Sequence, residues 1–202
     1  MREINLEGRA QCPQDWTFCH SESHASSALK PCCHRKRGGS LLKNSGFIAK
    51  RITRRYRQTI SAPPESVFPL LCPVREAEWL DGWQYAMIYS ESGLIEEGAV
   101  FSTPHEGEED TVWIVTKHDP EKREIEFARF TPNSRTCVLR IAVGADTENR
   151  SFVDIAYTYT ATTPAGNDFI EGLTEETFLK SVVFWEKSVN HFLETGEKLI
   201  KT

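Results

Sequence analysis

The chain has 202 residues, of which 39% are hydrophobic, enough for one large domain or for one ordinary domain with an extension. Its net charge of -5 hides a split: residues 1–57 hold 12 Lys/Arg and 4 Asp/Glu, a net of +8, whereas residues 58–202 hold 12 and 25, a net of -13. No apolar run approaches the ~20 residues of a transmembrane helix, and no apolar secretory signal opens the chain, so we expect a cytoplasmic protein with no membrane span.

Residues 1–49 are basic and rich in Ser, Gly, Lys and Arg. They show neither a helical nor a strand period, and Gly38-Gly39-Ser40 is typical of a loop. We therefore predict a disordered N-terminal extension attached to a domain that spans residues 50–202. An alternative is that translation begins nearer Leu41 or Leu42, which would leave the extension out of the natural product.

The extension also holds most of the side chains that could bind a metal ion. It contains no Cys-x-x-Cys pair, and three adjacent side chains at positions 32–34 cannot easily face one ion, so we predict no metal site and no cofactor. The run Arg35-Lys36-Arg37 has no aromatic residues interleaved, which argues against sequence-specific nucleic-acid binding. The potential metal ligands are Cys12, Cys19, His20, His24, Cys32, Cys33 and His34.

The predicted domain opens with a strand over residues 51–60, in which Ile52, Tyr56 and Ile60 share one face. Ala62-Pro63-Pro64-Glu65-Ser66 then indicates a turn and a helix start, because proline is tolerated in a first helical turn. A short helix follows and is interrupted at Pro73, and a second short helix is predicted over residues 75–80.

After Gly82 the sequence predicts six more strands, each separated from the next by Gly, Asp, Asn, Glu or Pro residues. No helix of crossover length lies between them, so we predict an antiparallel sheet of seven strands in total and not a parallel one. The expected ranges are 83–89, 98–103, 111–118, 124–131, 135–145 and 151–162.

The last predicted element is a long amphipathic helix that begins after Thr174, a good N-cap, and runs to about Lys201. Its length of about 28 residues, or roughly 42 Å, is enough to cross a whole sheet. A helix this apolar must be covered, and the concave face of the sheet can cover it. Its apolar stripe consists of Phe178, Val182, Trp185, Val189, Phe192, Gly196 and Leu199.

This order of elements resembles the helix-grip fold of the START-like (SRPBCC) superfamily, which includes Bet v 1-type and polyketide cyclase/dehydrase-like proteins. The stretch Ala62-Pro63-Pro64-Glu65-Ser66-Val67-Phe68 looks like the family's strand-to-helix transition. Residues 72–83, with Cys72-Pro73-Val74-Arg75-Glu76, look like a bacterial branch of that superfamily, for which the resemblance supplies no activity. The resemblance implies an α+β domain, a curved seven-stranded sheet gripping a C-terminal helix around a hydrophobic cavity.

Polar residues on apolar faces are the best candidates for ligand contacts, since a buried polar group needs a partner. Arg129 shares a face with Ile125 and Phe127, and we predict that Arg129 and Phe127 line the cavity; a salt bridge at the sheet edge is the alternative for Arg129. Tyr157 and Tyr159 would add hydroxyl groups to the same cavity, or simply fill the core.

Tryptophans supply the remaining candidates for cavity walls. Trp79 and Trp83 follow the short helices, where this fold has its cavity entrance, and Trp113 and Trp185 are expected inside. For each of them ordinary core packing is the alternative.

No nucleophile and base can be assembled from the sequence, and no Gly-rich phosphate loop or Gly-x-Ser-x-Gly motif occurs. A carboxylate in an apolar pocket can still act as a general acid or base, because burial raises its pKa toward neutrality. Glu76 is the candidate that we prefer, since it lies between Arg75 and Trp79 in the most distinctive stretch. The other acidic residues of this region are Glu78, Asp81, Glu96 and Glu97.

Three functions are compatible with these patterns. The first is a binding or carrier protein for a small hydrophobic molecule held between the sheet and the long helix. The second is a cyclase- or dehydrase-like enzyme that uses the same cavity. The third is a protein-interaction module with an exposed aromatic patch at Trp79 and Trp83.

Overall fold

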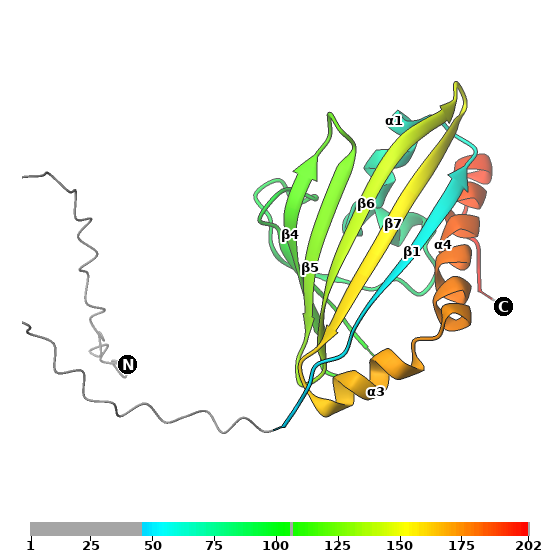
Figure 1. Cartoon of the computed structure of the whole chain (residues 1–202). Coiled ribbons are helices and arrows are strands. Elements are labelled where there is room, and N and C mark those ends of the chain that lie inside the picture. The colour runs from blue at the N-terminus through cyan, green and yellow to red at the C-terminus, as the bar shows by residue number, and fades with distance from the viewer. Residues whose placement is uncertain (1–45, 106, 202) are drawn as a thin grey trace, which may run out of the picture. The chain divides into compact units, whose positions relative to one another are not determined.

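The computed structural model describes residues 46–105 and 107–201, and it confirms the predicted fold class. One seven-stranded antiparallel sheet curves around a long helix near the C-terminal end of these residues (Figure 1). In chain order the elements are β1 (Arg51–Ile60), α1 (Pro64–Val67), the 3-10 helix η1 (Phe68–Leu71), α2 (Pro73–Trp79), β2 (Ala86–Tyr89), β3 (Val100–Thr103), β4 (Thr111–Asp119), β5 (Glu124–Thr131), β6 (Arg135–Thr147), β7 (Arg150–Ala161), α3 (Pro164–Gly172) and α4 (Glu175–Thr195).

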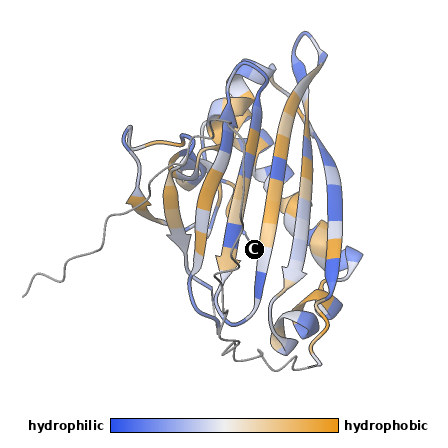
Figure 2. Ribbon diagram, turned by 60° about the vertical axis from the view of Figure 1, so that its left-hand side comes forward, coloured by the Kyte–Doolittle hydropathy of each residue, from blue (hydrophilic) through white to orange (hydrophobic). Residues whose placement is uncertain are grey.

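The strands are ordered β1-β7-β6-β5-β4-β3-β2, so the first strand pairs with the last and the others form a meander. Hydrophobic and hydrophilic residues alternate along much of the strands (Figure 2). In β6 and β7 buried residues alternate with more exposed ones, so one face of the sheet is buried and the other is more exposed. Leu139 of β6 and Tyr157 of β7, for example, lie opposite each other on the concave face, while Arg140 pairs with Ala156 on the convex face.

The long helix α4 packs along the concave side of β1 and is fixed there by polar contacts. The hydroxyl of Tyr56 donates to Glu186 at 2.7 Å, and the amide of Gln58, which is fully buried, donates to the backbone oxygen of Val182 at 3.0 Å. These bonds set the helix at the β1 side of the sheet. The concave space in front of β3 to β6 is therefore not filled by α4.

The helix α4 is shorter than the sequence predicts. Thr174 caps it as expected, its hydroxyl accepting from the backbone N–H of Thr177 at 3.1 Å. The helix ends at Thr195, however, because Gly196 adopts a left-handed conformation with φ of 73°. The prediction that Gly196 and Leu199 continue the helical stripe is therefore wrong, and Leu199 instead forms a parallel bridge with Leu80 at the end of α2.

The helix α3 was not predicted from the sequence. Thr163 caps it, Pro164 opens it, and Ile170 packs on the second hydrophobic cluster, which contains Cys137 and Tyr159. Gly166 is required there, because a Cβ at this position would overlap the backbone oxygen of Ser134. Nine residues with two glycines carry too weak a helical period to be recognised.

Several predictions concern residues 1–45, which lie outside the described residues. They are the disordered extension, of which residues 1–45 of the predicted 1–49 are concerned, the alternative start, and the absence of a metal site among Cys12, Cys19, His20, His24, Cys32, Cys33 and His34. Within residues 46–105 and 107–201, no helix is both long and apolar enough to cross a membrane.

Candidate functional site

A cavity of about 330 Å³ lies between the concave face of β3 to β7 and the helices α2 and α4. For comparison, an engineered cavity of about 150 Å³ binds benzene, and ligand pockets generally begin near 300 Å³. The space is therefore suited to a molecule about the size of two fused rings. Its walls come from five strands and two helices, so the whole fold positions the site.

Aromatic side chains form much of the wall. Phe101 stacks on Trp113 with ring centroids 5.4 Å apart, and Phe127 meets Trp113 edge to face at 5.8 Å. The indole N–H of Trp113 donates to the hydroxyl of Thr103 at 2.9 Å, and that of Trp83 donates to the backbone oxygen of Pro73 at 2.8 Å. Because these donors are already used, the rings present apolar surface to the cavity.

Arg129 projects from β5 into this aromatic space. Its Nη2 donates to the hydroxyl of Tyr159 at 2.7 Å, and the guanidinium carbon lies 4.6 Å from the ring centroid of Trp113 and 5.4 Å from that of Tyr157. Among the described residues no Asp or Glu forms an ion pair with it. The sheet-edge salt bridge considered from the sequence is thus not present there, and the partial exposure of Arg129 is toward the cavity.

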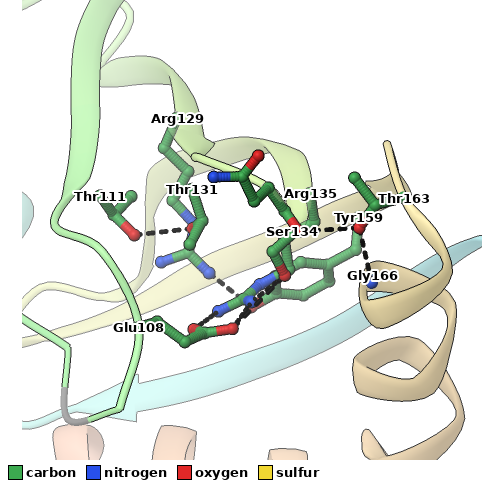
Figure 3. A network of polar contacts seen from close by, with 10 residues as sticks. Glu108, Thr111, Arg129, Thr131, Ser134, Arg135, Tyr159, Thr163 and Gly166 are labelled. Carbon is green, nitrogen blue, oxygen red and sulfur yellow. Dashed lines mark hydrogen bonds and ion pairs between the residues drawn. The ribbon is translucent and has the colours of Figure 1, made fainter.

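A second arginine on the same face has a different environment. Arg135 of β6 makes two hydrogen bonds to Glu108, of 2.7 and 2.9 Å (Figure 3). Its guanidinium carbon also lies 3.5 Å from the ring centroid of Phe169. Only 5% of its side chain is exposed, and Ser134 accepts a further hydrogen bond at 2.7 Å. We call these four residues the Arg135 cluster. Its charge is matched, and the bidentate pair lowers the pKa of Glu108.

Glu76, the acid–base candidate that we prefer from the sequence, lines the cavity from α2. Its carboxyl group makes no hydrogen bond or ion pair with the described residues. Burial raises its pKa from 4.5 to about 8, so at neutral pH the group is mostly protonated. Burial is the main cause that raises the pKa of Tyr157, which lines the same cavity.

The other acidic candidates lie outside the cavity. Glu78 is exposed and pairs with Arg75 at 2.6 Å. Asp81 accepts a hydrogen bond from the backbone N–H of Lys201 at 3.0 Å, and the carboxylate of Glu96 accepts hydrogen bonds from Ser90 and the backbone of its own loop. Of the five carboxylates considered, Glu76 alone faces the cavity.

The structure brings six of the eight predicted ligand-binding residues to the cavity wall. Two predicted positions differ. Trp79 is fully buried against Trp185, 5.4 Å between ring centroids, and donates to the backbone oxygen of Leu70, so it is a core residue. Tyr159 does not line the cavity but holds Arg129. The six that line it are Trp83, Trp113, Phe127, Arg129, Tyr157 and Trp185.

Several lining residues were not singled out from the sequence. Leu139, Ile141 and Ile155 complete the floor, and the inward alternation of their strands was a usable signal for them. His105 lies at the rim, after β3, and its pKa is lowered by burial and by Arg129 and Arg135. No sequence pattern connects His105 with the cavity, since it sits in a loop.

A larger but shallower depression, of about 670 Å³, lies on the convex face. Six of its seven charged side chains are paired with one another, as in Arg57 with Asp154 and Arg140 with Glu126, both at 2.6 Å. It therefore offers few free polar groups, and the enclosed cavity is the better candidate site.

No protein-family model and no curated protein matches this chain. Solved structures do match this chain. Norcoclaurine synthase from Thalictrum flavum in complex with dopamine and hydroxybenzaldehyde aligns with a TM-score of 0.55 and 11% identity, over 72% of this chain and 88% of that one. The chain has the helix-grip fold.

Two further proteins share this helix-grip fold. The Zhui aromatase/cyclase from Streptomyces sp. R1128 aligns with a TM-score of 0.54 and 12% identity, over 74% of this chain and all of that chain. An uncharacterised protein from Rhizobium leguminosarum aligns with a TM-score of 0.52 and 15% identity, over 73% of this chain and 97% of that one. At these identities the similarity concerns the helix-grip fold, and the function has to be argued from the cavity.

Proposed function

We propose that this protein binds a small, largely apolar molecule in the cavity between the sheet and helices α2 and α4. The observation that carries the proposal is the cavity itself, because protein interiors are otherwise packed with few voids larger than a water molecule. Aromatic walls with a small number of polar groups, here Glu76 and Arg129, are the usual composition of a ligand site.

The structural neighbours support the same class of ligand. The norcoclaurine synthase structure contains dopamine and hydroxybenzaldehyde, two small aromatic molecules. The inward positions of Trp79 and Trp83 also disfavour an interaction module built on an exposed patch of these two rings. Trp79 is fully buried and Trp83 lines the cavity.

Titration with N-phenyl-1-naphthylamine, an uncharged fluorescent probe made of a naphthyl group and a phenyl ring, tests this function. We expect saturable binding with a blue-shifted emission, and at least tenfold weaker binding in Leu139→Trp, which fills the cavity floor. The matched control is Val138→Trp, which places the same ring on the convex side of the same strand. Failure of the wild type to bind the probe, or equal effects of the two variants, would contradict the proposal.

The alternative function is acid–base catalysis on a bound apolar substrate, and a specific observation favours it. Glu76 is a carboxyl group inside the cavity that has no partner among the residues that the structure describes, and burial raises its pKa to about 8. A base of this pKa in an apolar site removes protons from carbon efficiently near neutral pH.

The ring opening of 5-nitrobenzisoxazole tests Glu76 as a base, because it requires only removal of the C–H proton while the N–O bond breaks. We expect a rate that rises toward pH 8 and is lost in Glu76→Gln. Glu78→Gln, on the exposed side of α2, should keep the rate. A rate that survives Glu76→Gln would remove this candidate without affecting the binding proposal.

A further inference from the structure

We propose that the molecule held in the cavity carries one anionic oxygen group, such as a carboxylate, an enolate or a phenolate, bound by the guanidinium of Arg129. This inference rests on the proposed binding function and names the chemical class of its ligand: an aromatic or similarly apolar body of about two rings with a single negative charge.

The first step concerns the donors of Arg129. A guanidinium has five N–H donors, and among the described residues one of them is used in a hydrogen bond to an oxygen, from Nη2 to Tyr159 at 2.7 Å. The thiol of Cys137 is a second, weak acceptor. The rings of Trp113, Tyr157 and Tyr159 contact the cation through their π faces and satisfy no N–H group. The remaining donors are available to a ligand in the cavity.

The second step concerns charge. A cation in an apolar environment is stabilised chiefly by an anion beside it, yet within residues 46–105 and 107–201 no Asp or Glu is paired with Arg129. Glu108 is bound to Arg135, and Glu76 is kept mostly protonated at neutral pH by burial. His105 at the rim has a lowered pKa and adds no positive charge. The charges of the described residues that line the cavity thus sum to one positive unit, and one anionic group would balance it.

The Arg135 cluster provides a comparison, because it shows the contacts of a buried arginine with a structural role in this fold. There the guanidinium has a bidentate carboxylate, a hydroxyl acceptor and an aromatic ring beneath it. Arg129 sits on the neighbouring strand, on the same concave face, with the rings and a hydroxyl but without the carboxylate. Figure 3 shows the two side chains side by side. The ligand would supply the missing carboxylate or an equivalent oxygen.

The test compares two probes that share one body. 1-Anilinonaphthalene-8-sulfonate is N-phenyl-1-naphthylamine with an added anionic group. In Arg129→Met we expect the sulfonate to bind at least tenfold more weakly than in the wild type, while the affinity for the uncharged probe changes less than threefold. Arg129→Lys should keep part of the preference. Arg140→Met, an arginine on the convex face whose side chain is 61% exposed, is the control for surface binding.

A second measurement needs no variant. On the wild-type protein, 2-naphthoate should displace N-phenyl-1-naphthylamine at a concentration at least tenfold lower than 2-naphthalenemethanol does, because the two competitors differ in the anionic group. Equal displacement, or stronger displacement by the alcohol, would overturn the assignment of Arg129 as an anion site.

The outcomes separate the two proposals. If the uncharged probe does not bind the wild type, the binding function itself fails. If the uncharged probe binds but Arg129→Met weakens both probes equally, or leaves the sulfonate unaffected, the cavity function stands and the anion assignment fails. If Arg140→Met lost as much affinity for the sulfonate as Arg129→Met, the sulfonate would be responding to surface charge, and this would also overturn the assignment.

Discussion

Arg129 and Arg135 offer a comparison between two regions of one sheet face. Both side chains leave neighbouring strands on the concave side, and both lie against aromatic rings. Arg135 is closed in by Glu108 and Ser134. Arg129 instead faces the cavity of about 330 Å³, and Tyr159 is its one oxygen partner in the part of the chain that the structure describes. On our proposal, the buried charge serves stability in the region of Arg135 and ligand recognition in the region of Arg129.

The largest expected effect separates the two arginines by stability. Arg135→Met should lower the free energy of unfolding by about 3 kcal/mol, because it leaves Glu108 without its partner and removes the packing on Phe169. Arg129→Met should change it by less than about 1 kcal/mol or increase it, since no carboxylate is left unpaired. Urea denaturation of both variants measures this. Similar losses in the two would contradict the division of roles.

A smaller effect is expected from Glu76 and depends on pH. The folded protein holds the proton of Glu76 up to about pH 8, whereas an unfolded chain releases it near 4.5. Between these values the unfolded state binds fewer protons, so this group lowers the free energy of unfolding as pH rises. Glu76→Gln does not titrate. It should therefore be more stable than the wild type by on the order of 1–3 kcal/mol at pH 8, allowing for partial exposure to the cavity, and equally stable at pH 4.

Urea denaturation at both pH values provides the measurement. Glu78→Gln is the matched control, because Glu78 is on the same helix but exposed. An advantage of Glu76→Gln that is equal at pH 4 and pH 8 would show that the carboxyl group does not titrate as burial requires.

The smallest expected effect concerns anion binding as Glu76 ionises. Affinity for 1-anilinonaphthalene-8-sulfonate should fall about threefold to tenfold between pH 7 and pH 9, because a second negative charge then enters the cavity. The other titratable groups around Arg129 hold their state in this range. His105 is already neutral, and burial raises the pKa values of Tyr157, Tyr159 and Cys137. In Glu76→Gln the affinity should be constant; a fall of the same size there would assign it to another group.

The strands could be predicted closely because alternation and turn residues are local properties. β5 has the predicted bounds, residues 124–131, and β1 has the predicted range, 51–60. The apolar spacing led to a wrong helix end where a single residue fixes the backbone conformation. Gly196 ends α4, although the spacing continues to Leu199. The sequence did not predict α3, because its two glycines and its single turn of apolar contacts give no clear helical period.

The candidate site was predicted in composition but not in arrangement. The inward face of β5 identified Arg129 and Phe127, since alternation fixes the side of the sheet. Whether Arg129 has a carboxylate partner depends on the conformation of the loop that carries Glu108. In the structure Glu108 pairs with Arg135 and not with Arg129. The sequence also could not separate Trp79 from Trp83, because four residues of helix and turn decide which indole packs into the core and which borders the cavity.

The aromatic walls have an optical consequence. Three tryptophans, Trp83, Trp113 and Trp185, border the cavity, while Trp79 is buried behind Trp185. A bound chromophore that absorbs in the indole emission band would lie in contact with three natural energy donors. The protein therefore contains its own spectroscopic reporter, and occupancy of the cavity can be followed by quenching of intrinsic fluorescence without any label.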